Sequence, residues 1–135
     1  MIVSKVVRAG VVTLLVGAGL LVTPAAANAS AGGCSVYLYA GSCFEINGNG
    51  TWVNWMRGST DNKQSHYQLL ETCIDAPYGT LACGGWKNVA PGRSTGYTYA
   101  PGNRSYAPGN YCAESYAQFA GGQVRNVGGH CLNIH

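Results

Sequence analysis

Charged side chains are scarce in this sequence: eight lysines and arginines and five acidic residues make up 10% of the 135 positions. No run of basic residues occurs, so the positive surface that nucleic acids and anionic membranes attract is missing. No stretch after residue 30 keeps the apolar period of an amphipathic helix. We therefore expect no nucleic-acid partner and no helical fold.

Catalytic motifs are missing as well. No G-x-S-x-G element accompanies the three histidines, and a catalytic triad is defined by a geometry that spacing alone does not provide. The remaining combinations are of the kind any small domain contains: Ser65-His66 with Asp61 or Asp75, Glu45 with Glu114, and Asp61 with Asp75. We predict a protein without enzymatic activity and without a cofactor.

The C-terminal sequence GGHCLNIH raises a metal alternative, because His130 and His135 flank Cys131. A zinc site needs four ligands at recognisable spacings, commonly with a C-x2–4-C element. No two cysteines of this chain are closer than nine positions. In an exported chain Cys131 is expected to be oxidised, so we predict no metal site.

Residues 1–29 have the pattern of a cleaved secretory signal peptide. Lys5 and Arg8 precede the apolar run VVTLLVGAGLLV, and Ala27-Asn28-Ala29 offers an A-x-A cleavage site before Ser30. The run is short for a membrane span, which takes about 20 residues, so an uncleaved anchor is the weaker alternative. Cleavage leaves six basic and five acidic residues, a net charge of about +1. We expect a secreted protein with no membrane contact after cleavage, and residues 30–135 as a single β domain.

All six cysteines follow the predicted cleavage site, and an even number in a short exported chain indicates three disulfides. Such bridges stabilise mainly by restricting the unfolded chain, by about 2–4 kcal/mol each. A sandwich can also join strands that are distant in sequence, so crossed pairings are an alternative. The spacing favours three local bridges: Cys34–Cys43, Cys73–Cys83 and Cys112–Cys131.

Strand signals recur about every 8–12 residues between clusters of glycine, asparagine and proline, which is typical of a small sandwich or barrel. The expected strands are residues 34–39, 43–46, 51–56, 66–74, 81–83, 85–89, 97–99, 111–119 and 131–134. The fold class is therefore all-β, a small disulfide-stapled β-sandwich or barrel.

The sequence NGNG between the second and third of these strands predicts a hairpin closed by Asn-Gly turn chemistry. In the strand that follows, strict alternation assigns each side chain to a face. It places Trp52, Asn54 and Met56 on one face, and Val53 and Trp55 on the other.

Ala-Pro-Gly occurs three times, beginning at Ala90, Ala100 and Ala107. Proline fixes φ at the second position of a β-turn, and glycine takes the positive φ that a type II turn requires next. Residues 103–106 lie between the last two turns and have room for a very short strand. The segment therefore predicts a tight zigzag of the chain.

Tyrosine, tryptophan, glycine, serine and asparagine dominate the chain after its signal segment, and binding loops use the same residues. Exposed aromatics beside amides also suit stacking on sugar rings. The alternative is that the rings fill the edge of a small β core, because tyrosine is intermediate in burial. The predicted contact surface is Tyr99, Arg104, Tyr106 and Tyr111, with Trp52 and Trp55 as a second patch.

The segment YTYAPGNRSYAPGNYC, followed by FAGG and GGHC, resembles the C-terminal part of the spore-associated protein A family of actinobacteria. The resemblance covers about the last third of the chain and lacks the tryptophan that the family places before its Gly-Gly. It implies a secreted protein associated with spores or hyphae. The matching residues are Tyr99, Pro108, Gly109, Cys112, Gly121, Gly122, His130 and Cys131.

The segment LACGGWKNVAPG is similar to the Cys-x-x-Val-Ala-Pro-Gly element of the small proteinaceous α-amylase inhibitors, with extra residues after the cysteine. The matching residues are Cys83, Val89, Ala90, Pro91 and Gly92. This resemblance implies a β-sandwich. The family's Trp-Arg-Tyr binding tripeptide is absent here, where the nearest sequence is Trp55-Met56-Arg57, so amylase binding is not implied.

We predict a secreted, non-catalytic, monomeric protein that acts by binding at the cell or spore surface or in the extracellular medium. Its expected partner is a cell-surface polymer or an extracellular protein. The alternative is an inhibitor of an extracellular hydrolase, an amylase or a protease, in which a Pro-Gly-braced loop enters the enzyme's cleft. An inhibitor would titrate its enzyme one to one, whereas a surface protein would stay with cells or polymer.

Overall fold

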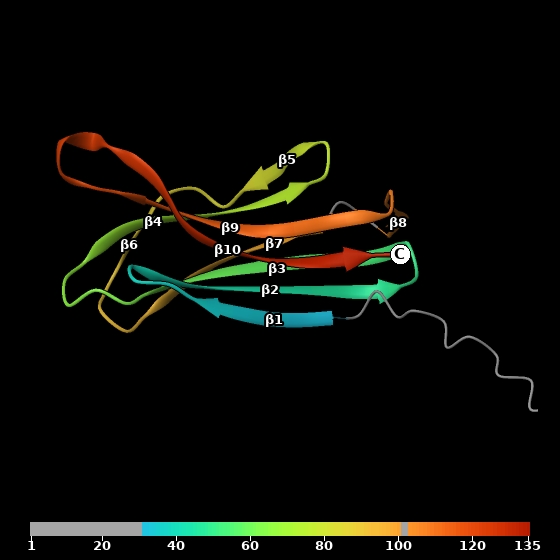
Figure 1. The fold of residues 1–135 in the computed structure, drawn as a ribbon, viewed down its shortest axis with the longest axis horizontal. Helices are drawn as coiled ribbons and strands as arrows, with labels where there is room; N and C mark the ends of the chain where they lie inside the picture. Colours follow the sequence, from blue (N-terminus) through green and yellow to red (C-terminus); the bar gives the residue numbers. More distant parts are fainter. Residues whose placement is uncertain (1–30, 101–102) are drawn as a thin grey trace, which may run out of the picture.

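The computed structural model describes residues 31–100 and 103–135, which form two antiparallel β-sheets packed face to face (Figure 1). The predicted signal segment 1–29 lies outside the described residues, as do Pro101 and Gly102 of the second Ala-Pro-Gly turn. In the described part, the one helical segment is the short 3-10 turn η1 (Ala120–Gly122), and no helix there is long and apolar enough to cross a bilayer. The all-β prediction is confirmed, and the architecture is a sandwich.

Sheet A has the strand order β1–β2–β3–β7, and the short strand β8 also pairs with β3. The predicted hairpin between β2 and β3 is present, and Gly50 takes a φ of +58° in its turn. The very short strand predicted between the last two Pro-Gly turns is β8. The strands of sheet A are β1 (Ala31–Val36), β2 (Ala40–Asn49), β3 (Trp52–Asn62), β7 (Ser94–Tyr99) and β8 (Arg104–Ser105).

Sheet B has the order β10–β9–β4–β5, with β6 also pairing with β4. Its strands are β4 (Gln68–Ala76), β5 (Gly79–Cys83), β6 (Lys87–Val89), β9 (Gly109–Gln118) and β10 (Val124–Ile134). The longest apolar run of the sequence forms β4, which lies inside the sheet between β9 and the pair β5 and β6. Every strand predicted from the sequence is present, most of them longer than predicted.

The Pro-Gly turn between β6 and β7 has the predicted chemistry. Gly92 takes a φ of +68°, and the Arg93 amide donates to the Ala90 carbonyl oxygen at 3.1 Å. The first strand ends earlier than predicted, at Val36, because residues 37–39 form the connection to β2.

The three predicted local disulfides are confirmed: Cys34–Cys43, Cys73–Cys83 and Cys112–Cys131. In each bridge the two cysteines are directly opposed on neighbouring antiparallel strands. The neighbours of Cys43, Cys73 and Cys112 along the chain are buried, so the three bridges lie on the outer faces of the sheets. Each bridge therefore fixes the register of one strand pair.

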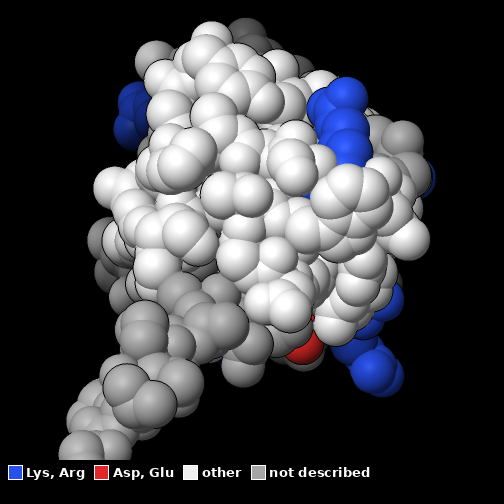
Figure 2. Space-filling model, turned by 90° about the vertical axis from the view of Figure 1, so that its right-hand side faces the viewer, with Lys and Arg blue, Asp and Glu red and all other residues white. Residues whose placement is uncertain are grey.

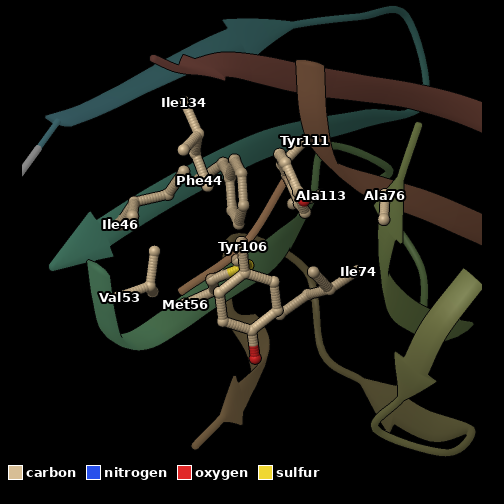
Figure 3. Close-up of a cluster of buried hydrophobic side chains, with 10 residues drawn as sticks. All are labelled: Phe44, Ile46, Val53, Met56, Ile74, Ala76, Tyr106, Tyr111, Ala113 and Ile134. Carbon is tan, nitrogen blue, oxygen red and sulfur yellow. The ribbon is translucent and has the colours of Figure 1, made fainter. Parts of the chain in front are cut away.

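The interior contains two separate hydrophobic clusters. The larger lies toward the end of the sandwich where β2 meets β3 (Figure 3). Its buried members are Phe44, Ile46, Val53, Met56, Ile74, Ala76, Tyr106, Tyr111, Ala113 and Ile134. The smaller cluster consists of Ala40, Leu70, Val89, Ala117 and Val127.

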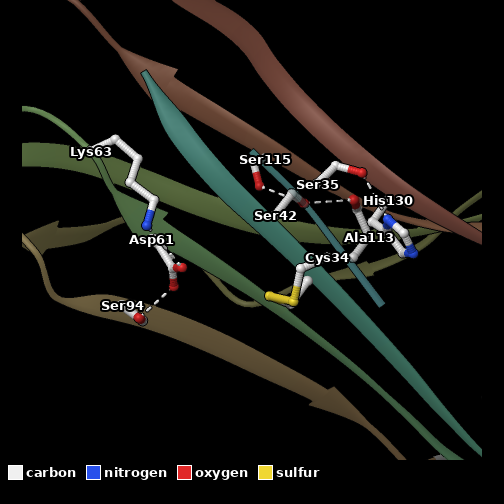
Figure 4. The surroundings of a disulfide bond; sticks show 10 residues. Cys34, Ser35, Ser42, Asp61, Lys63, Ser94, Ala113, Ser115 and His130 are labelled. Atoms are coloured by element: carbon white, nitrogen blue, oxygen red, sulfur yellow. Dashed lines mark hydrogen bonds and ion pairs between the residues drawn. A yellow bond between two sulfur atoms is a disulfide. The ribbon is translucent and has the colours of Figure 1, made fainter. Parts of the chain in front are cut away.

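A chain of four buried hydroxyl groups, which we call the hydroxyl chain, separates the two clusters. Ser42, Thr60, Thr72 and Ser115 are each at most 2% exposed, and they come from β2, β3, β4 and β9. Ser42 Oγ donates to the Ala113 carbonyl oxygen, and Ser115 Oγ donates to Ser42 Oγ at 3.0 Å (Figure 4). Thr60 Oγ1 lies 2.7 Å from both Ser115 Oγ and Thr72 Oγ1.

The direction of this chain follows from counting protons, because each hydroxyl has one to donate. Ser115 has used its proton on Ser42, so Thr60 must donate to Ser115. Thr60 then has none left, so Thr72 must donate to Thr60. The chain runs in one direction and ends on a carbonyl oxygen, so all four buried donors are satisfied.

Strands β1 and β10, at the edges of the two sheets, close one side of the sandwich. Ser35 Oγ lies 2.8 Å from His130 Nδ1 (Figure 4). The Tyr37 hydroxyl donates to the Gly129 carbonyl oxygen. Gly128 takes a φ of +146°, and the Tyr37 ring occupies the place where a Cβ of that residue would lie. Side chains, not a strand ladder, therefore join the two sheets here.

Candidate functional site

The predicted tyrosine surface is only partly on the surface. Tyr106 is 5% exposed and Tyr111 is fully buried, so neither ring lies on the surface on which the sequence analysis placed it. Their rings meet edge to face at 5.9 Å inside the larger cluster (Figure 3). The alternative interpretation, that the rings complete the core, describes both residues.

The Tyr106 ring is buried because β8 pairs with β3. That pairing continues in a hydrogen bond from the Tyr106 amide to the Thr51 carbonyl at 2.9 Å, which brings the Tyr106 ring against the core. Arg104 remains exposed, places its guanidinium group 4.8 Å from the centre of the Tyr106 ring, and donates to the half-buried Tyr99 hydroxyl at 3.3 Å. Arg104 and Tyr99 therefore cover the edge of the core above Tyr106, so little of the predicted contact surface is free for a partner.

The burial of Tyr111 has a consequence at high pH. Burial first, and the nearby Tyr78 second, raise the pKa of Tyr111 from 10.0 to about 12. The folded protein holds this proton more tightly than the unfolded chain, so the stability it confers is complete below about pH 10 and is lost as the pH rises toward 12. We expect the free energy of unfolding to fall by about 2 kcal/mol over this window.

Guanidinium unfolding at about pH 9 and about pH 12 measures this loss. The variant Tyr111→Phe has no proton to lose and should show a smaller fall, whereas Tyr67→Phe, at a 64% exposed ring, should behave like the parent protein. An unchanged alkaline loss in Tyr111→Phe would contradict the prediction.

The second predicted patch, Trp52 and Trp55, is at the surface, and a β-bulge aligns its two rings. Asn47 pairs with Trp55 and Gly48 pairs with Val53, so Asn54 is an extra residue in β3. Val53 and Met56 are both buried although they are three positions apart. Because side chains alternate on each side of the bulge, Trp52 and Trp55 both point outward.

The predicted assignment of faces in this strand is therefore wrong. Strict alternation separated Trp52 from Trp55 and placed Met56 with Trp52, whereas the inserted residue brings the two tryptophans to the same face. The Asn54 side-chain amide donates to Asn47 Oδ1 at 2.8 Å and holds the bulge closed. Trp52 is 47% exposed and Trp55 is half-buried.

Arg57 continues this row of outward residues along β3 and is held on two sides. Its guanidinium carbon lies 5.1 Å from the centre of the Trp55 ring. Its Nε donates to Thr98 Oγ1 on β7 at 3.2 Å. A stacked and hydrogen-bonded arginine loses little further freedom when a ligand binds to its terminal nitrogens.

A shallow groove lies beside Arg57 on the outer face of sheet A. It has a volume of about 330 Å³, near the lower end for ligand pockets of about 300–1,000 Å³. Its lining includes Gly32, the Cys34–Cys43 bridge, Glu45, Arg57 and Ser59. The groove exists because small residues and a disulfide occupy this face where longer side chains would fill it.

Glu45 faces Arg57 directly across the β2–β3 ladder. Both side chains are exposed, yet within the described ranges Lys63–Asp61, at 3.6 Å, is the sole ion pair. The Glu45 carboxylate has no hydrogen bond from any described residue. The groove therefore has a free carboxylate on one wall and a fixed guanidinium group on the other.

Few charges surround this end of the sandwich. Figure 2 shows the end where the C-terminus and the β2–β3 turn lie, as a broad uncharged surface with basic and acidic side chains only at its margins. Three of the five acids, Glu71, Asp75 and Glu114, belong to β4 and β9 of sheet B, where alternation points them to the opposite outer face.

The acid pairs considered from the sequence are not assembled. Glu45 and Glu114 lie on opposite outer faces of the sandwich, and so do Asp61 and Asp75. Asp61 is instead engaged with Ser94 and Lys63 (Figure 4). Neither pair has the shared site that a glycosidase requires.

Sequence reasoning missed the contact between Ser35 and His130, which are 95 positions apart. A serine beside a histidine is the core of a nucleophile and base pair, but a third group must orient the histidine. In the described part of the chain no acid bonds to His130, whose ring packs against Gly33. We assign this contact to the closing of the sandwich edge.

Two groups of side chains have the composition of metal ligands: Glu71 with Cys73 and Cys83, and Glu114 with Cys112 and Cys131. All four sulfur atoms are already bonded in disulfides. A cysteine binds a metal ion as a free thiolate, so neither group is a candidate metal site.

Comparison with protein-family models, with curated proteins and with solved structures finds no match for this chain. The resemblances to spore-associated protein A and to the amylase inhibitors therefore stay predictions. The function of the candidate site therefore depends on its own geometry, because a fold alone does not determine function.

Proposed function

We propose that this protein is a secreted, non-catalytic binding protein that attaches to a polysaccharide of the cell or spore surface through the outer face of sheet A. The observation that carries the proposal is the alignment of Trp52 and Trp55 by the bulge, next to the groove between Glu45 and Arg57. Flat aromatic rings beside a few polar groups form a surface on which sugar rings stack and hydrogen-bond.

Export is part of the proposal. Three disulfides form and persist in oxidising surroundings outside the cytosol. The rigid strands of sheet A also suit recognition, because side chains on paired strands lose little freedom on binding. A flat sheet face that binds a polymer would keep the protein on the surface from which the polymer extends.

The test uses the full chain, exported by an expression host and purified from the medium. It is mixed with insoluble cell-wall polysaccharides of the native host, and the bound fraction is measured by sedimentation. We expect Trp52→Ala/Trp55→Ala to bind at least tenfold more weakly, because the stacking rings are gone.

Trp86→Ala is the matched control, because Trp86 is 37% exposed and lies between β5 and β6 of sheet B. It should bind like the parent protein. Equal binding by the double variant and the parent would refute the proposed site. Recovery of the native protein from the medium in a one-to-one complex with a hydrolase would favour the inhibitor alternative instead.

A further inference from the structure

We infer that the groove selects an uncharged sugar, held by two neighbouring hydroxyl groups between the Glu45 carboxylate and the Arg57 guanidinium group. This inference rests on the proposed polysaccharide-binding function and names the chemical class of the ligand. It follows from how the two charged residues are placed and from what each has left to bond.

Arg57 supplies the fixed donor. Its Nε is already bonded to Thr98, and its plane lies over Trp55, so its position is set before a ligand arrives. The terminal nitrogens of the guanidinium group have no hydrogen bond to any described residue. They can donate to the oxygen of a sugar hydroxyl, and a charged donor makes such a bond stronger than a neutral one does.

Glu45 supplies the acceptor. It is opposite Arg57 in register, where neighbouring Cβ atoms of a ladder lie about 5 Å apart. Long side chains at this distance commonly form an ion pair, but here Arg57 is turned toward Trp55 and Thr98. The free carboxylate can accept hydrogen bonds from one or two hydroxyl groups, which a sugar presents on adjacent carbons.

The closeness of these two charges disfavours a charged ligand. A uronic acid carboxylate bonded to Arg57 would lie near Glu45, and the repulsion between the two like charges would offset much of its attraction to Arg57. An amino sugar bonded to Glu45 would meet the same penalty from Arg57. A neutral diol bonds to both groups without either penalty, and the low charge of the adjoining end (Figure 2) fits such a ligand.

The tryptophans extend the site along β3. Arg57 covers part of the Trp55 ring, whereas the described residues place no cation over the 47% exposed Trp52. The two residues are three positions apart, which is at most about 10 Å along a strand and less across a bulge. This is comparable to the length of two linked sugars, so a chain held at the groove can continue over Trp52.

The experiment compares a matched pair of polymers, a neutral galactan and polygalacturonate, by affinity electrophoresis of the full exported chain. We expect retardation by the neutral polymer, little change with added salt, and weaker or no retardation by the acidic one. Glu45→Gln should weaken neutral binding at least tenfold, and Glu71→Gln, on the opposite face, should not change it.

Gly32→Leu is a second variant that removes no polar group. A Cβ at Gly32 would lie 3.0 Å from Glu45 Cγ, so the added side chain would occupy the groove after a small shift of Glu45. Gly32→Leu should abolish binding to the neutral polymer. Its unfolding should match that of the parent protein, which would show that the site is lost and the fold is kept.

Three outcomes would overturn, respectively, the choice of a neutral sugar, the role of the groove and the proposed function. Salt-sensitive binding to polygalacturonate that improves in Glu45→Gln overturns the neutral-sugar inference and leaves the proposed function standing. Neutral binding that is unchanged in both Glu45→Gln and Gly32→Leu overturns the role of the groove. If neither polymer binds and the tryptophan variant also leaves cell-wall binding unchanged, the proposed function itself fails.

Discussion

Replacing Tyr106 with alanine is expected to lower the free energy of unfolding by about 3–5 kcal/mol, the usual cost of truncating a large buried aromatic residue. The ring is 95% buried, meets Tyr111 edge to face, and lies beneath Arg104. Truncation would open a cavity in the larger cluster at the place where β8 closes it. Guanidinium unfolding of the oxidised protein measures the change.

Two further variants distinguish the burial of the Tyr106 ring from the contribution of its hydroxyl group and from the loss of an exposed ring. The Tyr106 hydroxyl is buried, and its neighbours Arg104 and Tyr99 do not reach it in good hydrogen-bond geometry, so Tyr106→Phe should leave stability unchanged or raise it. Tyr78→Ala removes a ring that is 65% exposed and should cost no more than about 0.5 kcal/mol. A loss of less than 1 kcal/mol in Tyr106→Ala would show that the ring is not part of the core.

This result would also decide between the two interpretations that the sequence left open for the YAPGN repeat. Turn chemistry identifies where the chain reverses, but not which side of the next residue faces the core. Tyr106 is directed inward by the pairing of β8 with β3, which joins segments about fifty positions apart. No local pattern contains that pairing, so the sequence predicted the short strand and left the direction of the ring open.

The disulfides and the turns could be predicted because their causes are local. Each bridge joins strands that are adjacent in sequence, and the Asn-Gly and Pro-Gly turns are set by the φ preferences of two residues. The bulge at Asn54 was missed for a related reason. A bulge is defined by two strands together, and the sequence of β3 alone is compatible with unbroken alternation.

The candidate site depends on that bulge. With strict alternation, Trp52 and Trp55 would lie on opposite faces, and one of them would be in the core. The inserted residue brings both to the face that also has Arg57, Glu45 and the groove. Sequence composition named the tryptophans as a candidate patch, but only the paired strands show that they form one surface with two charged residues.

Replacing Thr60 with valine is expected to cost about 2–4 kcal/mol, although the two side chains have nearly the same shape. Thr60 is the middle of the hydroxyl chain, where it accepts from Thr72 and donates to Ser115. Valine breaks both bonds and leaves the Thr72 hydroxyl buried without an acceptor. The unsatisfied Thr72 donor costs about 1–3 kcal/mol, and the lost bond from Thr60 to Ser115 adds about 1 kcal/mol.

The direction of the chain makes the order of related variants predictable. Thr72 only donates, so Thr72→Val removes the first hydroxyl and leaves no donor unsatisfied; it should cost about 1 kcal/mol. The double variant Thr60→Val/Thr72→Val also leaves no unsatisfied donor, and it should be more stable than Thr60→Val alone. A double-mutant cycle from guanidinium unfolding measures this coupling.

A double variant less stable than Thr60→Val would mean that the hydroxyl chain runs in the opposite direction or that the threonines stabilise by packing alone. The expected order would instead show that the hydroxyl groups act as one unit. They cross the sandwich between two apolar clusters and bond four strands of both sheets in one arrangement. Because a buried hydroxyl is costly in every other alignment, such a chain penalises sliding of one sheet over the other, which apolar contacts alone would tolerate. The outer face of sheet A then presents its tryptophans and its groove from a fixed position.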